Sequence, residues 1–321
     1  MSGGFTSILA PQLSEYVAFK RALGRRYGRV EHKVRMFDRF VATRVQRAAD
    51  VDLEDLISGW IARPGERGPA TVRYELCHVR QFCLFLQRRD PTAYVPERGL
   101  APRPPRFNPH ILSRAEVSRL LRATKRLNET RRWPGYRALM FRTQIEILYC
   151  TGLRPGEAIR LRCCDLDLDG CLFRILDSKG KSRIVPFSRS LGARSGAFMD
   201  YRRRVARTAP DDRLFIKPTG GAYGAGEAGT RIRHLLAVAG IRSRQGRQGP
   251  RPYDLRHTFA VHRLTAWYRS GVDLFERLPL LSAYMGHDDL LGTEIYLTAT
   301  PELLDIASRR FAARLRRTEN A

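Results

Sequence analysis

A proline-rich stretch constrains this chain more than any other feature of its sequence. Residues 90–110 read DPTAYVPERGLAPRPPRFNPH and contain six prolines. Because proline lacks a backbone donor and restricts the residue before it, neither a helix nor a central strand can run through this stretch. A length of 321 residues also favours more than one hydrophobic core. We therefore predict a first domain at 1–95, a linker at 96–110 and a second domain at 111–321.

The part before the prolines has the periodicity of helices. Apolar residues recur three and four positions apart within 12–48, on either side of a basic break, GRRYGR, at 24–29. Similar stripes occur at 52–62 and 71–89. These patterns predict a small all-helical domain.

The part after the prolines is also helical, with one change of period. Ser113 and Glu116 form the sequence signature of a capping box at a helix start. Residues 171–187, CLFRILDSKGKSRIVPF, place apolar and β-branched runs around a Lys-Gly-Lys turn and predict a β-hairpin. Further helices are predicted at 136–150, at 228–239 and from 254 onward. The predicted fold class is mainly α with a small β-hairpin or sheet.

The charge of the chain points to a polyanionic partner. Lysine and arginine together number 58 against 32 aspartates and glutamates, a formal net charge of +26. Clustered cations raise the local potential and release counterions from phosphates, so nucleic acid is the expected partner. Lysine is scarce in this chain, which makes the pair Lys179 and Lys181 at the predicted hairpin tip informative.

Several classes of protein are disfavoured. No apolar run approaches the roughly 18 residues of a membrane span, and the N-terminus lacks a signal-peptide pattern, so we expect a cytoplasmic protein. The six cysteines are expected to be reduced and mostly buried, and Cys163, Cys164 and Cys171 have poor spacing for zinc. Neither GxxxxGK[ST] nor HExxH occurs, so we expect no metal or nucleotide cofactor.

Five short motifs carry the chemistry. TGLRPGEAIRL (151–161) places Arg154 at a loop-to-helix junction, with Glu157 three residues on and within reach of an ion pair. DLRHTFA places Arg256 on a helix, and a Gly-His pair ends at His287. Tyr296 follows nine residues later. The fifth motif is the lysine-bearing hairpin that ends in RIVPF.

In this order and spacing, the motifs resemble the tyrosine recombinase family, also called the phage integrase family, over about residues 111–310. The helical block before the linker resembles the core-binding domain of that family. The long interval between Arg256 and His287 resembles the branch of mobile-element integrases and transposases. The resemblance implies a two-domain, C-shaped DNA clamp with a catalytic second domain.

The resemblance also implies a mechanism, a site-specific DNA recombinase or integrase that needs neither metal nor ATP. It would cut and rejoin DNA through a 3′-phosphotyrosyl intermediate. The implied roles are a nucleophile, Tyr296; two phosphate-binding arginines, Arg154 and Arg256; a general acid, Lys179; a hydrogen-bond donor to phosphate, His287; and Glu157, which orients Arg154.

The chain departs from the family pattern at three places. Tyr253 stands where the family usually has histidine, and a phenol is a poor base at neutral pH. His257 falls on a different helical face, so we do not expect it to substitute. The hairpin is short, which leaves Lys181 as an alternative general acid. The extra residues before His287 must be absorbed without moving it, with Trp267, Tyr268 and Phe275 expected to pack in a core.

The expected partner is double-stranded DNA carrying specific recombination sites, in a bacterial, nucleoid-associated setting. A homotetramer would assemble on two such sites, with accessory DNA-bending or recombinase partners. Two alternatives remain: a type IB topoisomerase-like enzyme that relaxes supercoils, and a DNA-binding accessory protein or regulator whose catalysis has lapsed. Tyr253 favours the second alternative.

Overall fold

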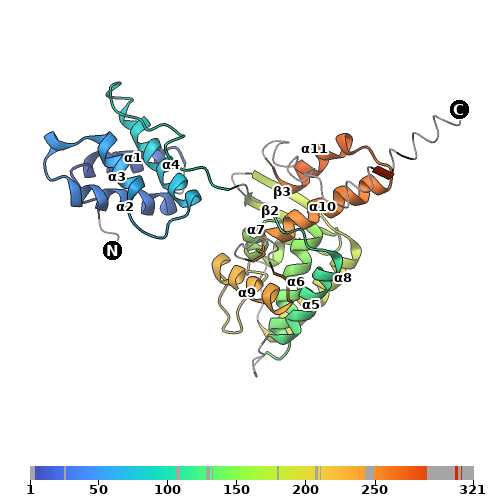
Figure 1. Ribbon diagram of the computed structural model, residues 1–321. Helices are drawn as coiled ribbons and strands as arrows, with labels where there is room; N and C mark the ends of the chain where they lie inside the picture. The colour runs from blue at the N-terminus through green and yellow to red at the C-terminus, as the bar shows by residue number, and fades with distance from the viewer. Residues whose placement is uncertain are drawn as a thin grey trace. The chain divides into compact units, whose positions relative to one another are not determined.

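The computed structural model describes two compact units, which divide between Phe107 and Asn108, within the proline-rich stretch (Figure 1). The described residues are 4–24, 27–105, 109–127, 131, 133–178, 181–206, 209, 211–242, 249–287, 308–309 and 312. Among them, no helix is both long and apolar enough to cross a membrane. The expected fold class, mainly helical with a small sheet in two parts, is confirmed, whereas the clamp arrangement stays a prediction.

The first unit is a small helical bundle, as its periodicity predicts. Its described elements are α1 (Ala10–Ala22), α2 (Gly28–Arg44), η1 (Ala48–Asp50), α3 (Leu53–Ala62) and α4 (Pro69–Leu86). Its core includes Leu13, Tyr16, Phe37, Trp60 and Phe82, all fully buried. Local chemistry sets the helix ends: Asp52 accepts from the backbone of Glu54 at 2.8 Å, and Pro69 opens α4 where its missing donor costs nothing.

The second unit is larger and carries the sheet. Its described elements are α5 (Arg114–Ala123), η2 (Thr124–Arg126), α6 (Tyr136–Thr151), α7 (Pro155–Arg160), η3 (Cys163–Asp165), β1 (Leu166–Asp167), β2 (Leu172–Ser178), β3 (Lys181–Pro186), α8 (Arg189–Val205), α9 (Ala225–Val238), α10 (Asp254–Arg269) and α11 (Leu274–Met285). The predicted capping box is present: the Ser113 side chain accepts from the backbone N–H of Glu116, and the Glu116 side chain accepts from the backbone N–H of Ser113.

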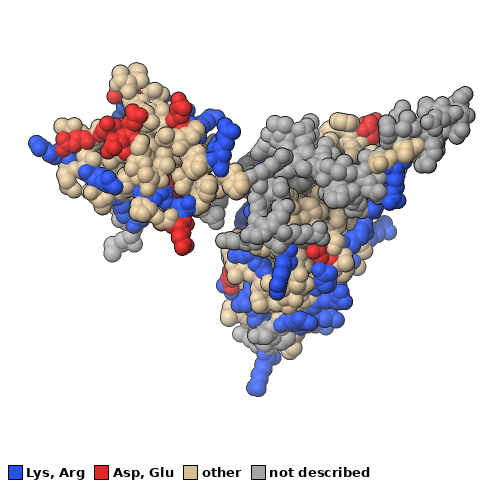
Figure 2. Space-filling model, viewed as in Figure 1, with Lys and Arg blue, Asp and Glu red and all other residues tan. Residues whose placement is uncertain are grey.

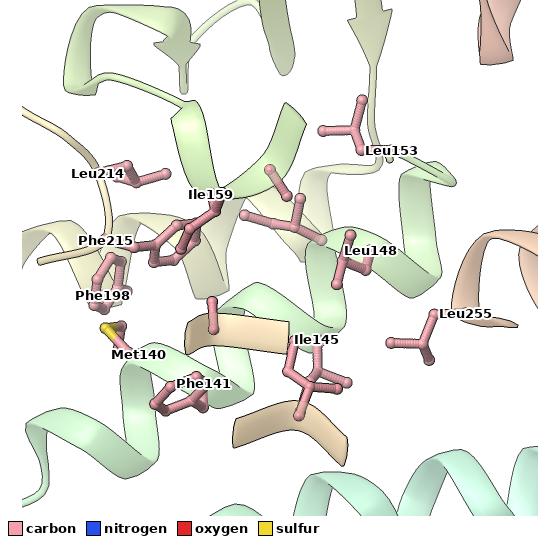
Figure 3. Packing of buried hydrophobic residues seen from close by; sticks show 14 of the residues in the cluster. Met140, Phe141, Ile145, Leu148, Leu153, Ile159, Phe198, Leu214, Phe215 and Leu255 are labelled. Carbon is pink, nitrogen blue, oxygen red and sulfur yellow. The ribbon is translucent and has the colours of Figure 1, made fainter. Parts of the chain in front are cut away.

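Helix α6 is the centre of the second unit. It is buried on nearly all sides and packs against α8 and α10, which is why its sequence is apolar rather than striped. Figure 3 shows the side chains that fill this core, which come from α6, α7, α8, α10 and the loop after α8. They include Met140, Phe141, Ile145, Leu148, Ile159, Phe198, Leu214, Phe215 and Leu255.

The sheet is a three-stranded antiparallel meander, β1-β2-β3. Phe173 pairs with Val185 and Ile175 with Arg183 before the register shifts ahead of Ser178. Phe173, Ile175 and Val185 are buried, so one face of the hairpin packs on the core. The predicted hairpin is therefore confirmed, and β1 extends it.

Three expectations need correction. Helix α8 was not predicted, because its sequence, RSLGARSGAFMDYRRRV, is rich in glycine, serine and arginine. Burial of Leu191 and Phe198 in the core decides the helix there. The cysteines are not mostly buried: Cys83 is buried, Cys77 and Cys164 are exposed, and the other three are half-buried. Phe275 is 82% exposed rather than packed, because it lies on the outward-facing side of α11.

Candidate active site

A sharp turn after α6 positions Arg154. Gly152 ends α6 with φ +63°, and a Cβ at this position would lie 2.3 Å from the ring of Phe259, so only glycine fits. Arg154 then precedes α7, where its backbone N–H donates to Glu157 at 2.9 Å and its Nη1 donates to the same carboxylate at 2.7 Å. The ion pair predicted from the sequence is confirmed.

Glu157 gathers donors from three elements. Besides Arg154, its carboxylate accepts from Ser178 at the end of β2 and from Arg183 on β3, whose Nη1 and Nη2 lie at 3.1 and 2.8 Å. Burial alone would raise the pKa of Glu157, but the hydrogen bonds from Arg183, Ser178 and Arg154 outweigh it and lower the pKa to about 2. Glu157 is therefore a carboxylate at any physiological pH.

Arg256 lies in the first turn of α10 and is fully buried. Its Nη1 donates to the carbonyl of Gly152 at 2.7 Å, and its Nη2 donates to the carbonyl of Met285 at 2.8 Å. These bonds join the end of α6, the start of α10 and the end of α11. They hold the guanidinium plane close to the turn that carries Arg154.

Three arginines bind the last carbonyls of α11, which we call the α11 carbonyl cluster: Tyr284, Met285 and Gly286. Arg183 donates to the first at 3.0 Å, Arg256 to the second at 2.8 Å and Arg154 to the third at 2.7 Å. Carbonyls at a helix C-terminus lack helical partners and carry partial negative charge, so cations stabilise them. His287 follows directly, and its N–H donates to the carbonyl of Ser282 at 3.0 Å.

Helices α10 and α11 absorb the long interval before His287. Gly286 ends α11 with φ +67° and turns the chain, so the interval adds helix without moving His287 away from the arginines. The structure thus brings Arg154, Glu157 and Arg256 together beside the segment that carries His287.

Tyr253 and His257 form a pair at the start of α10. Tyr253 is 37% exposed, and its ring meets that of His257 edge-on at a centroid distance of 5.2 Å. Burial lowers the pKa of His257 to about 4, and the charges of Arg251 and Arg256, together with nearby His287, act in the same direction. His257 is therefore neutral at pH 7. It contacts the residue that replaces the usual histidine, although sequence reasoning had set it aside.

Two predicted residues, Lys179 and Tyr296, lie outside the described residues. Lys181 opens β3 and is exposed, opposite Ser178 across the turn. In the part of the chain that the structure describes, no group of His, Cys, Asp and Glu has the arrangement of a metal site.

Arg183 and Ser178 were missed by sequence reasoning. The alternation of a strand carries the signal for Arg183, which lies two residues before the buried Val185 and so on the same, inward face of β3. An arginine on an inward face needs a buried anionic partner, and here it is Glu157.

The visible surface of the second unit is strongly basic. Among the described side chains of the second unit, Figure 2 shows lysine and arginine mainly over its lower and right-hand part, whereas acidic side chains gather on one side of the first unit. Such a basic face raises the local concentration of polyanions.

Comparison with known proteins identifies the family. The family model described as "Phage integrase family" matches residues 110–302. A putative integrase/recombinase, y4rB, of Sinorhizobium fredii is 32% identical over 313 residues, 94% of this chain and 96% of that protein. The tyrosine recombinase XerD of Caulobacter vibrioides is 30% identical over 258 residues, 79% of each chain.

Solved structures agree on the fold. The integrase of transposon Tn1549, in complex with transposon right-end DNA, matches with a TM-score of 0.66 at 16% identity, over 94% of this chain and 99% of that one. The XerA recombinase matches with a TM-score of 0.50 at 22% identity, over 94% and 98%. The chain belongs to the phage integrase family. It is a tyrosine-type DNA recombinase, as its motifs implied.

Proposed function

We propose that this protein is a site-specific recombinase that cuts and rejoins double-stranded DNA through a 3′-phosphotyrosyl intermediate at Tyr296. The observation that carries the proposal is the convergence of Arg154 and Arg256 on the α11 carbonyl cluster, directly before His287. This arrangement concentrates positive charge and N–H donors at one point, as a scissile phosphate requires.

The residues divide the work of phosphoryl transfer. The Tyr296 phenol loses its proton to water as its oxygen attacks phosphorus. The bond from phosphorus to the 5′-oxygen breaks, and Lys179 gives that oxygen a proton, with Lys181 as the alternative donor. Arg154, Arg256 and His287 stabilise the charge that develops on the non-bridging oxygens. A guanidinium has five donors, and side-chain bonds to described residues use two of those of Arg154, so it can bind a phosphate while it stays oriented.

The reverse step needs no external energy source. The tyrosyl ester retains the energy of the phosphodiester, so a 5′-hydroxyl from another strand can attack it and release Tyr296. Tyr253 stands where the family usually has a histidine, and the ring of the neutral His257 packs edge-on against it.

The partner follows from charge and family. A net charge of +26 suits double-stranded DNA, and a homotetramer on two recombination sites, with accessory partners, would exchange strands between them. Integration, excision or transposition of a mobile element is the role we propose, because the fold matches a transposon integrase and a relative is named integrase/recombinase.

Covalent capture tests this function. Wild type, Tyr296→Phe and the control Tyr201→Phe are incubated with nicked duplexes built from the DNA that flanks the gene, in chelator and without added metal, and run on denaturing gels. Tyr201 is a matched control because its hydroxyl donates to the carbonyl of Pro134, which precedes the start of α6, whereas Arg154 follows the end of that helix. We expect a shifted band with wild type and Tyr201→Phe and none with Tyr296→Phe. Salt-sensitive binding without a band would favour the accessory-protein alternative, and relaxation of any supercoiled plasmid would favour the topoisomerase-like alternative.

A further inference from the structure

Arg183 connects three elements that carry proposed catalytic residues. Its side chain is 13% exposed, and its bonds run in two directions. Nη1 and Nη2 donate to the carboxylate of Glu157, while Nε donates to the carbonyl of Tyr284. One planar group thus links the hairpin to α7 and to the end of α11.

We propose that Arg183 is a positioning residue for strand cleavage, which sets the relative placement of Arg154, His287 and the hairpin formed by β2 and β3. The inference rests on the proposed function, and it assigns Arg183 no contact with DNA. Arg183 acts through Glu157 on Arg154, and through the α11 carbonyl cluster on the segment that leads into His287.

The shared carboxylate explains how Arg183 would influence Arg154. Oε1 of Glu157 accepts from Arg154, Ser178 and Arg183, and Oε2 accepts from the backbone of Arg154 and from Arg183. Without Arg183, the buried carboxylate would be left with Arg154 as its only cation among the described residues. The attraction would then pull the Arg154 guanidinium toward Glu157 and away from the carbonyl of Gly286.

The contact with Gly286 explains how Arg183 would influence His287. A Cβ built on Gly286 would lie 2.9 Å from Nη1, 3.0 Å from Cζ and 3.1 Å from Nε of Arg183. The guanidinium therefore packs directly on the backbone that precedes His287. A lysine could not reproduce this, because its ammonium is a single point charge and the contacts need a planar fork.

We expect the loss of Arg183 to slow the chemical step of strand cleavage rather than to weaken DNA binding. Displacement of reacting groups by about 1 Å can cost roughly 100-fold in rate. DNA affinity comes from many phosphate contacts spread over the protein, so the loss of one partly buried arginine that touches no DNA leaves it nearly unchanged.

The experiment separates rate from binding. Full-length wild type, Arg183→Met and Arg183→Lys are saturated with the duplex that wild type cleaves, and the single-turnover rate of covalent capture is measured beside the Kd for the same duplex. We expect cleavage to slow about 100-fold in Arg183→Met and about tenfold in Arg183→Lys, with Kd within about threefold of wild type.

Arg174 supplies the matched control. It lies on the neighbouring strand and also bonds a carboxylate, Asp167 at 3.3 Å, and a backbone carbonyl, that of Cys164 at 3.2 Å, but it is 54% exposed. Arg174→Met removes the same kinds of hydrogen bond, one to a carboxylate and one to a backbone carbonyl, away from the site. We expect its cleavage rate to stay within about threefold of wild type, as for a surface pair.

A double-mutant cycle distinguishes positioning from general destabilisation. Because Arg183 acts through Glu157 as well as through the α11 carbonyl cluster, we expect Arg183→Met to add only about tenfold, rather than its own 100-fold, to the loss in Glu157→Gln. Multiplied losses would overturn the inference, as would wild-type cleavage by Arg183→Met. If Arg183→Met does not bind DNA, Arg183→Lys carries the test, and wild-type cleavage by Arg183→Lys would also overturn the inference. Absence of any wild-type covalent band would instead overturn the proposed function, and the inference with it.

Discussion

Each unit of this protein contains a buried glutamate that is held by a cluster of several buried or half-buried donors. In the first unit, Glu75 accepts from Lys33 at 3.1 Å, Arg63 at 2.8 Å and Arg67 at 3.0 Å. In the second unit, Glu157 is held by two arginines and a serine from three elements. Both carboxylates are almost completely buried, and neither would be tolerated there without its partners.

The two sites differ in where the other bonds of the cations go. Around Glu75 these bonds stay local: Arg67 donates to the carbonyls of Ile61 and Arg63, and Arg63 stacks on Trp60 at 3.0 Å from the ring centroid. The cluster therefore fastens α2, α3 and α4 to one another and ends there.

Around Glu157 the other hydrogen bonds of the arginines join residues that are far apart in the sequence. Arg183 and Arg154 continue to the carbonyls of Tyr284 and Gly286, which lie 101 and 132 residues away in sequence. A buried ion pair is thus a structural clamp in one unit and part of a candidate active site in the other. The structural role and the active-site role therefore do not differ in the buried carboxylate itself. They differ in the other hydrogen-bond partners of the arginines, which are near in sequence around Glu75 and distant around Glu157.

The largest expected effect comes from neutralising each glutamate. Glu157→Gln and Glu75→Gln should each destabilise their own unit by about 3–5 kcal/mol, because buried cations lose their partner. Only Glu157→Gln should also slow covalent capture by the folded protein, by about 100-fold. Urea unfolding and single-turnover cleavage at matched folded fraction measure both effects. A tenfold slower cleavage in Glu75→Gln at unchanged Kd would contradict the comparison.

The loss of unfolding free energy at low pH should isolate the contribution of Glu157 to stability. Its pKa is about 2 in the folded protein and near 4.5 when the chain unfolds, so its stabilisation is complete above pH 4.5 and is lost as the pH falls toward 2. Between pH 5.5 and 3, wild type should lose about 2 kcal/mol more than Glu157→Gln. Urea titrations of both proteins across this range measure the difference, and parallel curves would show that Glu157 keeps its ordinary pKa.

The smallest effect tests the carbonyl end of the network. Gly286 and Gly271 both have positive φ, +67° and +82°, but a Cβ on Gly271 would meet nothing within 4 Å. Alanine at either position should cost about 1–2 kcal/mol in backbone strain. Gly286→Ala should also displace Arg183 and slow cleavage about tenfold, while Gly271→Ala leaves the rate of the folded protein unchanged. Equal cleavage rates in the two variants would remove the contact between Arg183 and Gly286 from the mechanism.

Several features of this molecule are determined by short-range sequence patterns. The proline-rich stretch, the capping box at Ser113 and the hairpin around Lys179 each depend on a few neighbouring residues, and the sequence alone predicts them. The motifs around Arg154, Arg256 and His287 also locate the candidate site, because their order and spacing can be read directly from the sequence. Helix α8 was missed because its local propensity is weak and only burial of Phe198 and its neighbours selects the helix.

Other properties of the site arise only when distant segments meet. The sequence by itself determined the two-part organisation, the mainly helical fold class, the family and the local ion pair of Arg154 with Glu157. The tertiary structure decided that Arg183 shares the same carboxylate, that three arginines bind the end of α11, and that His257 lies neutral against Tyr253. The physical reason is that hydrogen-bond partners and desolvation depend on which atoms are close in space. Two of the three arginines at the end of α11 lie more than a hundred residues away from their carbonyl partners in the chain.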